Sequence, residues 1–183
     1  LSSVSYGQDF DNPSIIDQSA EIRAKKRALE KEMGFTIKRH PGRADVDEKV
    51  TGLIRSLESA TSFEEIEAIE TEHNRIAGIY ANQKSVAKRI REEYKRLSDD
   101  EYQGFLDELY LKEDPKEMDD VRFKAYMKDQ EHIVSTIGNR IRSDLEKMPQ
   151  WSDEEKAEFL RRLETITLSG PAVRLENDIH KRK

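Results

Sequence analysis

Two histidines follow a carboxylate at a spacing of three residues, and this pattern is the closest that the sequence comes to metal chemistry. Glu70 precedes His73, and Asp129 precedes His132. On a helix this spacing places both side chains on one face, and two such helices supply half of a di-metal site in a four-helix bundle. If the two helices form an antiparallel hairpin, however, the histidines differ in height by about 10 Å and cannot share a metal pair. We therefore expect no metal and no cofactor, and we interpret His73 and Gln83 as buried polar residues that fix helix register.

No other grouping of residues indicates catalysis. The sequence has no glycine-rich phosphate loop, no nucleophile elbow and no Ser/His/Asp arrangement. It contains no cysteine, which excludes a thiolate zinc site and a cysteine nucleophile. Carboxylates are so frequent that no pair of them is singled out for acid–base work. We therefore expect a protein that is not an enzyme.

Trp151 and Glu155 form a Trp-x-x-x-Glu motif. This motif resembles the short signature of bacterial all-helical effectors that act as guanine-nucleotide exchange factors. In those effectors most of the catalytic domain follows the motif, whereas here the motif lies late in the sequence. Trp151 is also explained as an apolar residue in front of a capping box. We assign no family, and an effector-like helical domain or an enzyme with an unrecognised site is the third alternative for function.

Two basic runs, residues 23–43 and 84–96, are the feature that would suit nucleic acid. Affinity for phosphate comes from several cations on one face that neutralise several phosphates together. Aromatic residues are sparse in these runs, strongly acidic blocks adjoin them, and no known recognition signature is present. A nucleic-acid-associated protein is therefore the alternative function and not the leading one.

The elements that must position these residues are helices. Four small polar residues are followed three positions later by a glutamate, which is the pattern of a capping box; they are Asp45, Ser62, Ser98 and Ser152. Asp114-Pro115 adds a cap followed by proline at the first helical position. These signals predict helices over 14–33, 45–60, 62–97, 99–111, 115–147, 153–167 and 171–182. Gly34 is expected to end the first helix, which leaves 35–43 as an ordered loop or a short strand.

Two predicted helices are much longer than the average of about 12 residues. In the third, apolar and large polar residues recur at alternating steps of three and four from Ile66 to Leu97. This is the 3.5-residue period of a left-handed supercoil. The fifth carries a wider stripe from Met118 to Met148. We predict an all-α protein, an elongated and mostly antiparallel helical bundle organised around helices 62–97 and 115–147 with coiled-coil-like packing.

The composition suits a folded helical chain. Of the 183 residues, 38% are charged and 35% hydrophobic; because the apolar residues are periodic, we assign the charges to the solvated faces of helices. Residues 1–13 show no periodic pattern of apolar residues and are predicted to form a flexible N-terminal arm. A single helical-bundle domain is predicted over 14–183. A first residue other than methionine indicates a processed product or an excised fragment. No apolar run could span a bilayer and no signal peptide is recognised, so we expect a soluble protein of unknown localisation.

Charge alternates in blocks along the chain. Net charge is +5 over residues 20–43, −6 over 44–75, +4 over 76–97 and −8 over 98–120. Part of this pattern follows from the helix dipole, which favours acidic starts and basic ends, and the plain interpretation is a set of solvated, cross-paired faces. The sharper interpretation is a bipolar rod that attracts different partners at its ends, or itself head to tail.

We expect a scaffold, adaptor or accessory domain that binds another protein and is a monomer in isolation. Long rods with one apolar seam present extended surfaces and little concave volume for small ligands. The residues expected to contact a protein partner are Phe35, Ile37 and His40 in the 35–43 segment and Lys84, Lys88, Arg91 and Lys95 at the basic end of the third helix.

Overall fold

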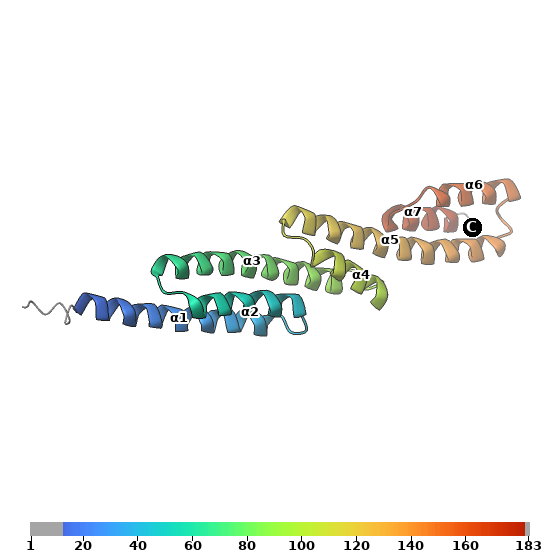
Figure 1. Cartoon of the computed structure of the whole chain (residues 1–183). Coiled ribbons are helices and arrows are strands. Elements are labelled where there is room, and N and C mark those ends of the chain that lie inside the picture. The colour runs from blue at the N-terminus through green and yellow to red at the C-terminus, as the bar shows by residue number, and fades with distance from the viewer. Residues whose placement is uncertain (1–12, 182–183) are drawn as a thin grey trace, which may run out of the picture. The chain divides into compact units, whose positions relative to one another are not determined.

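The computed structural model describes residues 13–181, and side chains from residue 18 onward. The predicted N-terminal arm therefore lies outside the described residues, apart from Pro13. Within the described range the protein is all-helical, as predicted, and its helices are α1 (Pro13–Arg39), α2 (Ala44–Ser59), α3 (Phe63–Glu93), α4 (Asp99–Leu109), α5 (Pro115–Glu146), α6 (Asp153–Glu164) and α7 (Ser169–His180) (Figure 1). None of these described helices combines the length and apolarity needed to cross a membrane.

The chain divides into two compact units, unit 1 up to Ala81 and unit 2 from Asn82 onward. The division falls inside α3, so this helix belongs to both units. A single domain over 14–183 stays a prediction.

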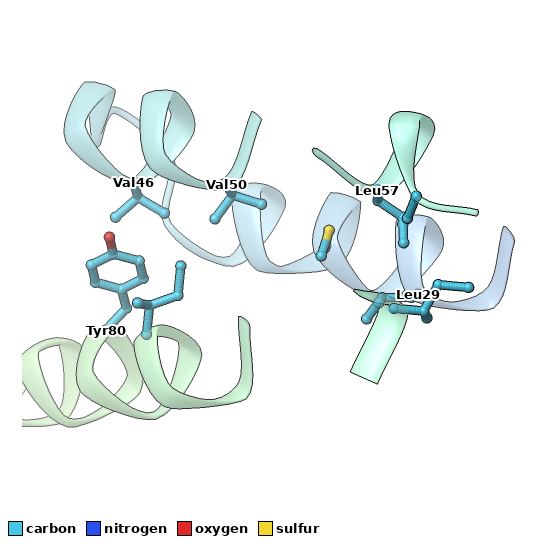
Figure 2. Packing of buried hydrophobic residues seen from close by; sticks show 9 residues of the cluster. Leu29, Val46, Val50, Leu57 and Tyr80 are labelled. Carbon is cyan, nitrogen blue, oxygen red and sulfur yellow. The ribbon is translucent and has the colours of Figure 1, made fainter. Parts of the chain in front are cut away.

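Unit 1 consists of α1, α2 and the first part of α3, which lie side by side in an up-down-up arrangement (Figure 1). Its core draws on all three helices, as Figure 2 shows for Leu29 from α1, Val46, Val50 and Leu57 from α2, and Tyr80 from α3. Val46 and Val50 have no exposed surface at all. The three helices are therefore held by one continuous apolar interior.

Unit 2 contains the end of α3 followed by α4, α5, α6 and α7. Its buried residues form separate clusters along α5. One cluster joins Ile90 of α3, and Tyr94 directly after this helix, to Ala125 of α5, with α4 packed against it. Another joins the second half of α5, including Ile141, to α6 and α7. Helix α5 is thus shared by two successive sets of packed helices.

Where α3 and α5 meet in unit 2, they run in the same direction. The Gln83 amide donates to the Lys112 carbonyl at 2.8 Å, and the Arg96 backbone N–H donates to Asp129 at 2.9 Å, so residue numbers rise together along both helices. Helix α4 returns the chain between them and is antiparallel to each (Figure 1). The helices that carry His73 and His132 therefore do not form the antiparallel hairpin that the sequence suggested.

The 3.5-residue seam of α3 is present as predicted. The seam residues that are buried are Ile66, His73, Ile76, Tyr80, Gln83, Ala87, Ile90 and Tyr94. The two polar members make specific hydrogen bonds, His73 to the Thr36 hydroxyl and Gln83 to the loop between α4 and α5. The seam therefore faces neighbours within each unit of this chain.

The sequence-based end of the first helix at Gly34 is wrong. Helix α1 continues to Arg39, and neither a strand nor a loop occupies 35–39. The apolar spacing that runs through Leu29 and Met33 continues with Thr36, Ile37 and His40, and burying this face outweighs the low helix propensity of glycine. The turn is instead made at Gly42, whose φ of 77° is in the left-handed region.

The predicted cap at Asp45 is also wrong. Helix α2 begins at Ala44 after Arg43, which provides no side-chain cap. Asp45 lies in the first turn, where it accepts two hydrogen bonds from the Arg43 guanidinium. Because this guanidinium bonds to it, the pKa of Asp45 is lowered. By contrast, the box predicted at Ser98 and Glu101 is complete.

Candidate functional site

The three residues predicted for partner contact in the 35–43 segment have different surroundings. Phe35 is 43% exposed on the outer face of α1, with the ammonium groups of Lys31 and Lys38 each 5.9 Å from its ring centroid. Ile37 is partly buried against the core of unit 1. His40 is buried and packs edge-on against Tyr80, with ring centroids 5.8 Å apart. Of the three, Phe35 is the one whose side chain lies open to a partner.

The four basic residues of the second predicted surface are all exposed. Lys84, Lys88 and Arg91 lie on one face of α3, whereas Lys95 follows the end of the helix at Glu93. Lys88 pairs with Glu92 at 3.8 Å, and Arg91 pairs with Asp99 at 3.7 Å while its guanidinium lies 4.8 Å from the Tyr102 ring centroid. This surface is therefore basic but already partly paired.

The two carboxylate–histidine pairs do not come together. His73 lies in unit 1 and is 4% exposed; its Nε2 bonds to Thr36 at 2.9 Å, and its Nδ1 has no partner. Burial lowers the pKa of His73, which outweighs the attraction of Glu32 and Glu70 for a proton. His132 lies in unit 2 and contacts Glu101 of α4 at 2.8 Å. In the part of the chain that the structure describes, no group of three or more potential ligands could hold a metal ion.

Several cations of the first basic run serve the fold of unit 1. The Lys26 ammonium donates to the carbonyls of Glu58 and Ala60 at 2.9 Å each, where α2 ends. Lys25 pairs with two glutamates of α3, and Arg43 pairs with Asp45. The run is therefore not one continuous surface for phosphate.

Trp151 also has a structural role. Its indole N–H donates to the Ile179 carbonyl at 3.2 Å, and its ring packs edge-on against Phe159 with centroids 4.8 Å apart.

An apolar groove lies on unit 2, at residues that the sequence pattern did not single out. It is a hollow of about 560 Å³ that follows one face of α5, between α4 and the connection from α6 to α7. Its apolar lining consists of Phe105, Phe123, Met127, Val134 and Ile166. Phe123 is 54% exposed, an unusual position for a large aromatic side chain.

The groove exists because α6 is too short to cover its face of α5. Helix α6 packs on α5 near Gly138, where a methyl group added to the glycine would lie 3.5 Å from Leu163. Steps of four, seven and four residues lead from Gly138 back through Val134, Met127 and Phe123, so these side chains lie on the same face. Helix α6 ends at Glu164, and Ile166 and Thr167 close that end of the groove.

Charged side chains line the edges of the groove. Lys124 pairs with Glu108 of α4 at 2.5 Å, and Lys128 pairs with Glu131 at 3.2 Å. Glu101 binds His132 and caps the start of α4, and the Ser98 backbone N–H bond lowers the pKa of Glu101. The Lys124–Glu108 and His132–Glu101 pairs tie α5 to α4 and fix the wall that carries Phe105.

One signal in the sequence could have revealed the groove. The apolar stripe from Met118 to Met148 leaves out Phe123, Met127 and Val134, which form a second stripe at i, i+4 and i+11. A helix with two apolar stripes has more apolar surface than one set of neighbours covers. The spacing alone does not tell that α6 stops short of the second stripe.

Comparisons with protein-family models, with curated proteins and with solved structures find no match for this chain.

Proposed function

We propose that this chain is a non-catalytic protein–protein interaction module that binds a helix of its partner in the groove of unit 2. The observation that supports this function best is the uncovered apolar face of α5 from Phe123 to Val134, bounded by α4 and by the α6–α7 connection. A helix laid there would continue the path of α6 and bury the exposed Phe123 ring. Burying an aromatic side chain in this way is typical of the residues that dominate binding energy.

The test is a selection from a displayed library of helical peptides, with wild-type protein as bait. We expect the selected peptides to share apolar residues at i, i+4 and i+7, and we expect Phe123→Glu to weaken their binding about tenfold or more, because it places a charge in the apolar groove. Val173→Glu is the matched control, because it places the same charge on an exposed apolar residue of α7 that does not line the groove. Peptides that bind Phe123→Glu as well as wild type would refute the groove as the binding site.

The basic surface of α3 is a second contact in this proposal, suited to an acidic flank of the partner. Replacing Lys84, Lys88, Arg91 and Lys95 together by glutamine should weaken acidic peptides more than neutral ones, and this difference should shrink as salt rises. Equal binding of both peptide classes to wild type and variant would remove this surface from the proposal.

The nucleic-acid alternative uses the same basic runs and makes a different prediction. Phosphate contacts make the logarithm of affinity fall linearly with the logarithm of salt concentration, with a slope set by the number of phosphates neutralised. We place this function second, because Lys25, Lys26 and Arg43 are engaged within unit 1. Fluorescence anisotropy of a labelled DNA duplex across a salt series measures the slope.

A further inference from the structure

The outer face of α1 combines cations with one exposed aromatic ring. Arg27, Lys31, Phe35 and Lys38 are all exposed, and their spacing of four, four and three residues places them on one face of the helix. Within the described residues these three cations have no ion-pair partner, and Lys31 and Lys38 instead lie near the Phe35 ring. We call these four residues the basic face.

One end of the groove on unit 2 has the opposite charge. Phe123 and Lys124 line both the groove and an adjoining hollow, whose other lining residues are three carboxylates and one cation, Glu108, Glu117, Asp120 and Lys112. Glu117 and Asp120 are exposed and, among the residues that the structure describes, form no ion pair. We call Glu117, Asp120 and Phe123 the acidic end of the groove.

The two surfaces match in spacing as well as in charge. Lys38 follows Phe35 by three residues, and Asp120 precedes Phe123 by three residues. On a helix this separation is about 4.5 Å along the axis in both cases. A ring from the basic face that lies against Phe123 can therefore bring its neighbouring cation to the height of Asp120. The same contact would cover both exposed phenylalanines.

We propose that the helix that fills the groove is α1 of a second copy of this chain, with Phe35 packed against Phe123 and with Lys38 facing Asp120 and Glu117. This inference rests on the proposed function, because it uses the same groove. The contact joins two different surfaces, so a pair keeps an unused acidic end on one copy and an unused basic face on the other. Such head-to-tail contacts build rings or open chains rather than closed two-fold dimers.

The test is the mass in solution, measured by sedimentation equilibrium over a wide range of protein concentration, at low and at high salt. We expect the mass to rise above the monomer mass of 21.3 kDa with concentration at low salt, and to fall back toward it at high salt, where exposed charges are screened. Lys31→Gln with Lys38→Gln should weaken association about tenfold or more, and so should Glu117→Gln with Asp120→Asn. Lys49→Gln with Lys147→Gln is the matched control, two exposed lysines outside both surfaces, and should associate like wild type.

Mixing the two impaired proteins gives the decisive result. The protein with the two lysine substitutions keeps an intact acidic end, and the protein with the two carboxylate substitutions keeps an intact basic face. An equimolar mixture should therefore form a one-to-one pair of twice the monomer mass and grow no further. Wild-type protein that stays a monomer at every concentration would overturn the proposal. So would association that survives in both impaired proteins, or a mixture that forms no pair.

The outcomes separate this inference from the proposed function. If displayed peptides bind in a Phe123-dependent manner while wild-type protein stays a monomer, the groove binds a different protein and only the self-association fails. If wild-type protein stays a monomer and instead binds labelled DNA with an affinity that Lys31→Gln and Lys38→Gln reduce, the basic face serves nucleic acid and the inference fails. If the self-association occurs but Phe123→Glu leaves it unchanged, the groove is not the binding site, and both the proposed function and this inference are refuted.

Discussion

Unit 1 and unit 2 are built from the same kind of helix but distribute their cores differently. In unit 1 a cluster of apolar residues reaches all three helices, and α2 covers α1 and α3 along most of its length (Figure 1). In unit 2 separate clusters follow one another along α5, because α4 and α6 are only 11 and 12 residues long while α5 has 32. A long helix with short neighbours keeps an uncovered stretch. That stretch is the groove, so the unit with the divided core also carries this exposed apolar surface.

The two units also use buried polar groups differently. Unit 1 places a histidine and a threonine against each other between α1 and α3. Unit 2 uses side chains of its long helices to bind backbone groups between helices and at the start of α7. The Gln83 amide donates to the Lys112 carbonyl, Asp129 accepts from the Arg96 N–H, and Gln130 accepts from the Ser169 N–H at 2.9 Å. Short helices that bury little apolar surface are thus held in place by hydrogen bonds to their ends.

The largest expected effect tests whether the two units unfold separately. Met33→Ala removes a side chain with no exposed surface from the core of unit 1 and should cost about 2–5 kcal/mol there. Trp151, the single tryptophan, lies in unit 2, so its fluorescence follows unit 2 while circular dichroism follows both units. Urea unfolding should show an earlier transition by circular dichroism and an unchanged transition by fluorescence. Transitions that shift together would instead support the single domain predicted from the sequence.

A second change tests the polar anchors of unit 2. Asp129→Ala leaves the Arg96 N–H without its acceptor in a partly buried site and should cost about 1–3 kcal/mol of unit 2 stability. Asp129→Asn keeps a side-chain oxygen and is the control, expected to lose less. The measurement is the urea midpoint by Trp151 fluorescence. An alanine variant as stable as wild type would show that the anchor contributes little.

Substituting two glycines of unit 1 by alanine should change the stability of this unit by smaller amounts and in opposite directions. Gly34→Ala should stabilise α1 by about 0.5–1 kcal/mol, because the residue is inside a helix and a Cβ would meet nothing within 4 Å. Gly42→Ala should destabilise the turn by about 1 kcal/mol or more, because its φ is 77°. Thermal unfolding by circular dichroism compares the two. Loss of stability in Gly34→Ala would contradict a continuous α1.

The smallest effect is a pH dependence that should distinguish the units. His73 has a lowered pKa in the folded protein, so the stability it contributes is complete above its ordinary pKa of 6.5 and is lost as pH falls below that value. Unit 1 should therefore weaken between pH 7 and pH 5.5. The pKa of Glu101 is lowered from 4.5, so its contribution to unit 2 is lost only at more acidic pH. Urea midpoints at both pH values check this, and His73→Gln should abolish the change in unit 1.

The sequence predicted most of the fold, because its signals are local. Capping residues and apolar spacing place all seven described helices, and the alternating steps of α3 identify its buried seam. The errors come from longer-range packing. Gly34 ends no helix because Thr36 and Ile37 find a buried face against α2 and α3, which no local signal announces.

Less of the candidate site could be predicted. Phe35 and the basic residues of α3 are exposed as expected, but Ile37 and His40 contribute to unit 1 instead. The groove was missed because it depends on where α6 stops relative to α5, which is a property of two helices together. Apolar residues such as Phe123 look alike in a sequence whether a neighbour covers them or not.

The membership of α3 in both units has a consequence for the order of folding. Starting a helix is costly, because several residues must be fixed before the first hydrogen bond forms, whereas each further residue adds a bond at once. Once α1 and α2 have packed on the first part of α3, the second part can grow from an existing helix end. Unit 2 can therefore start to fold from helical turns of α3 that have already formed up to Ala81. Unit 1, which emerges first during synthesis, has by then nucleated this helix.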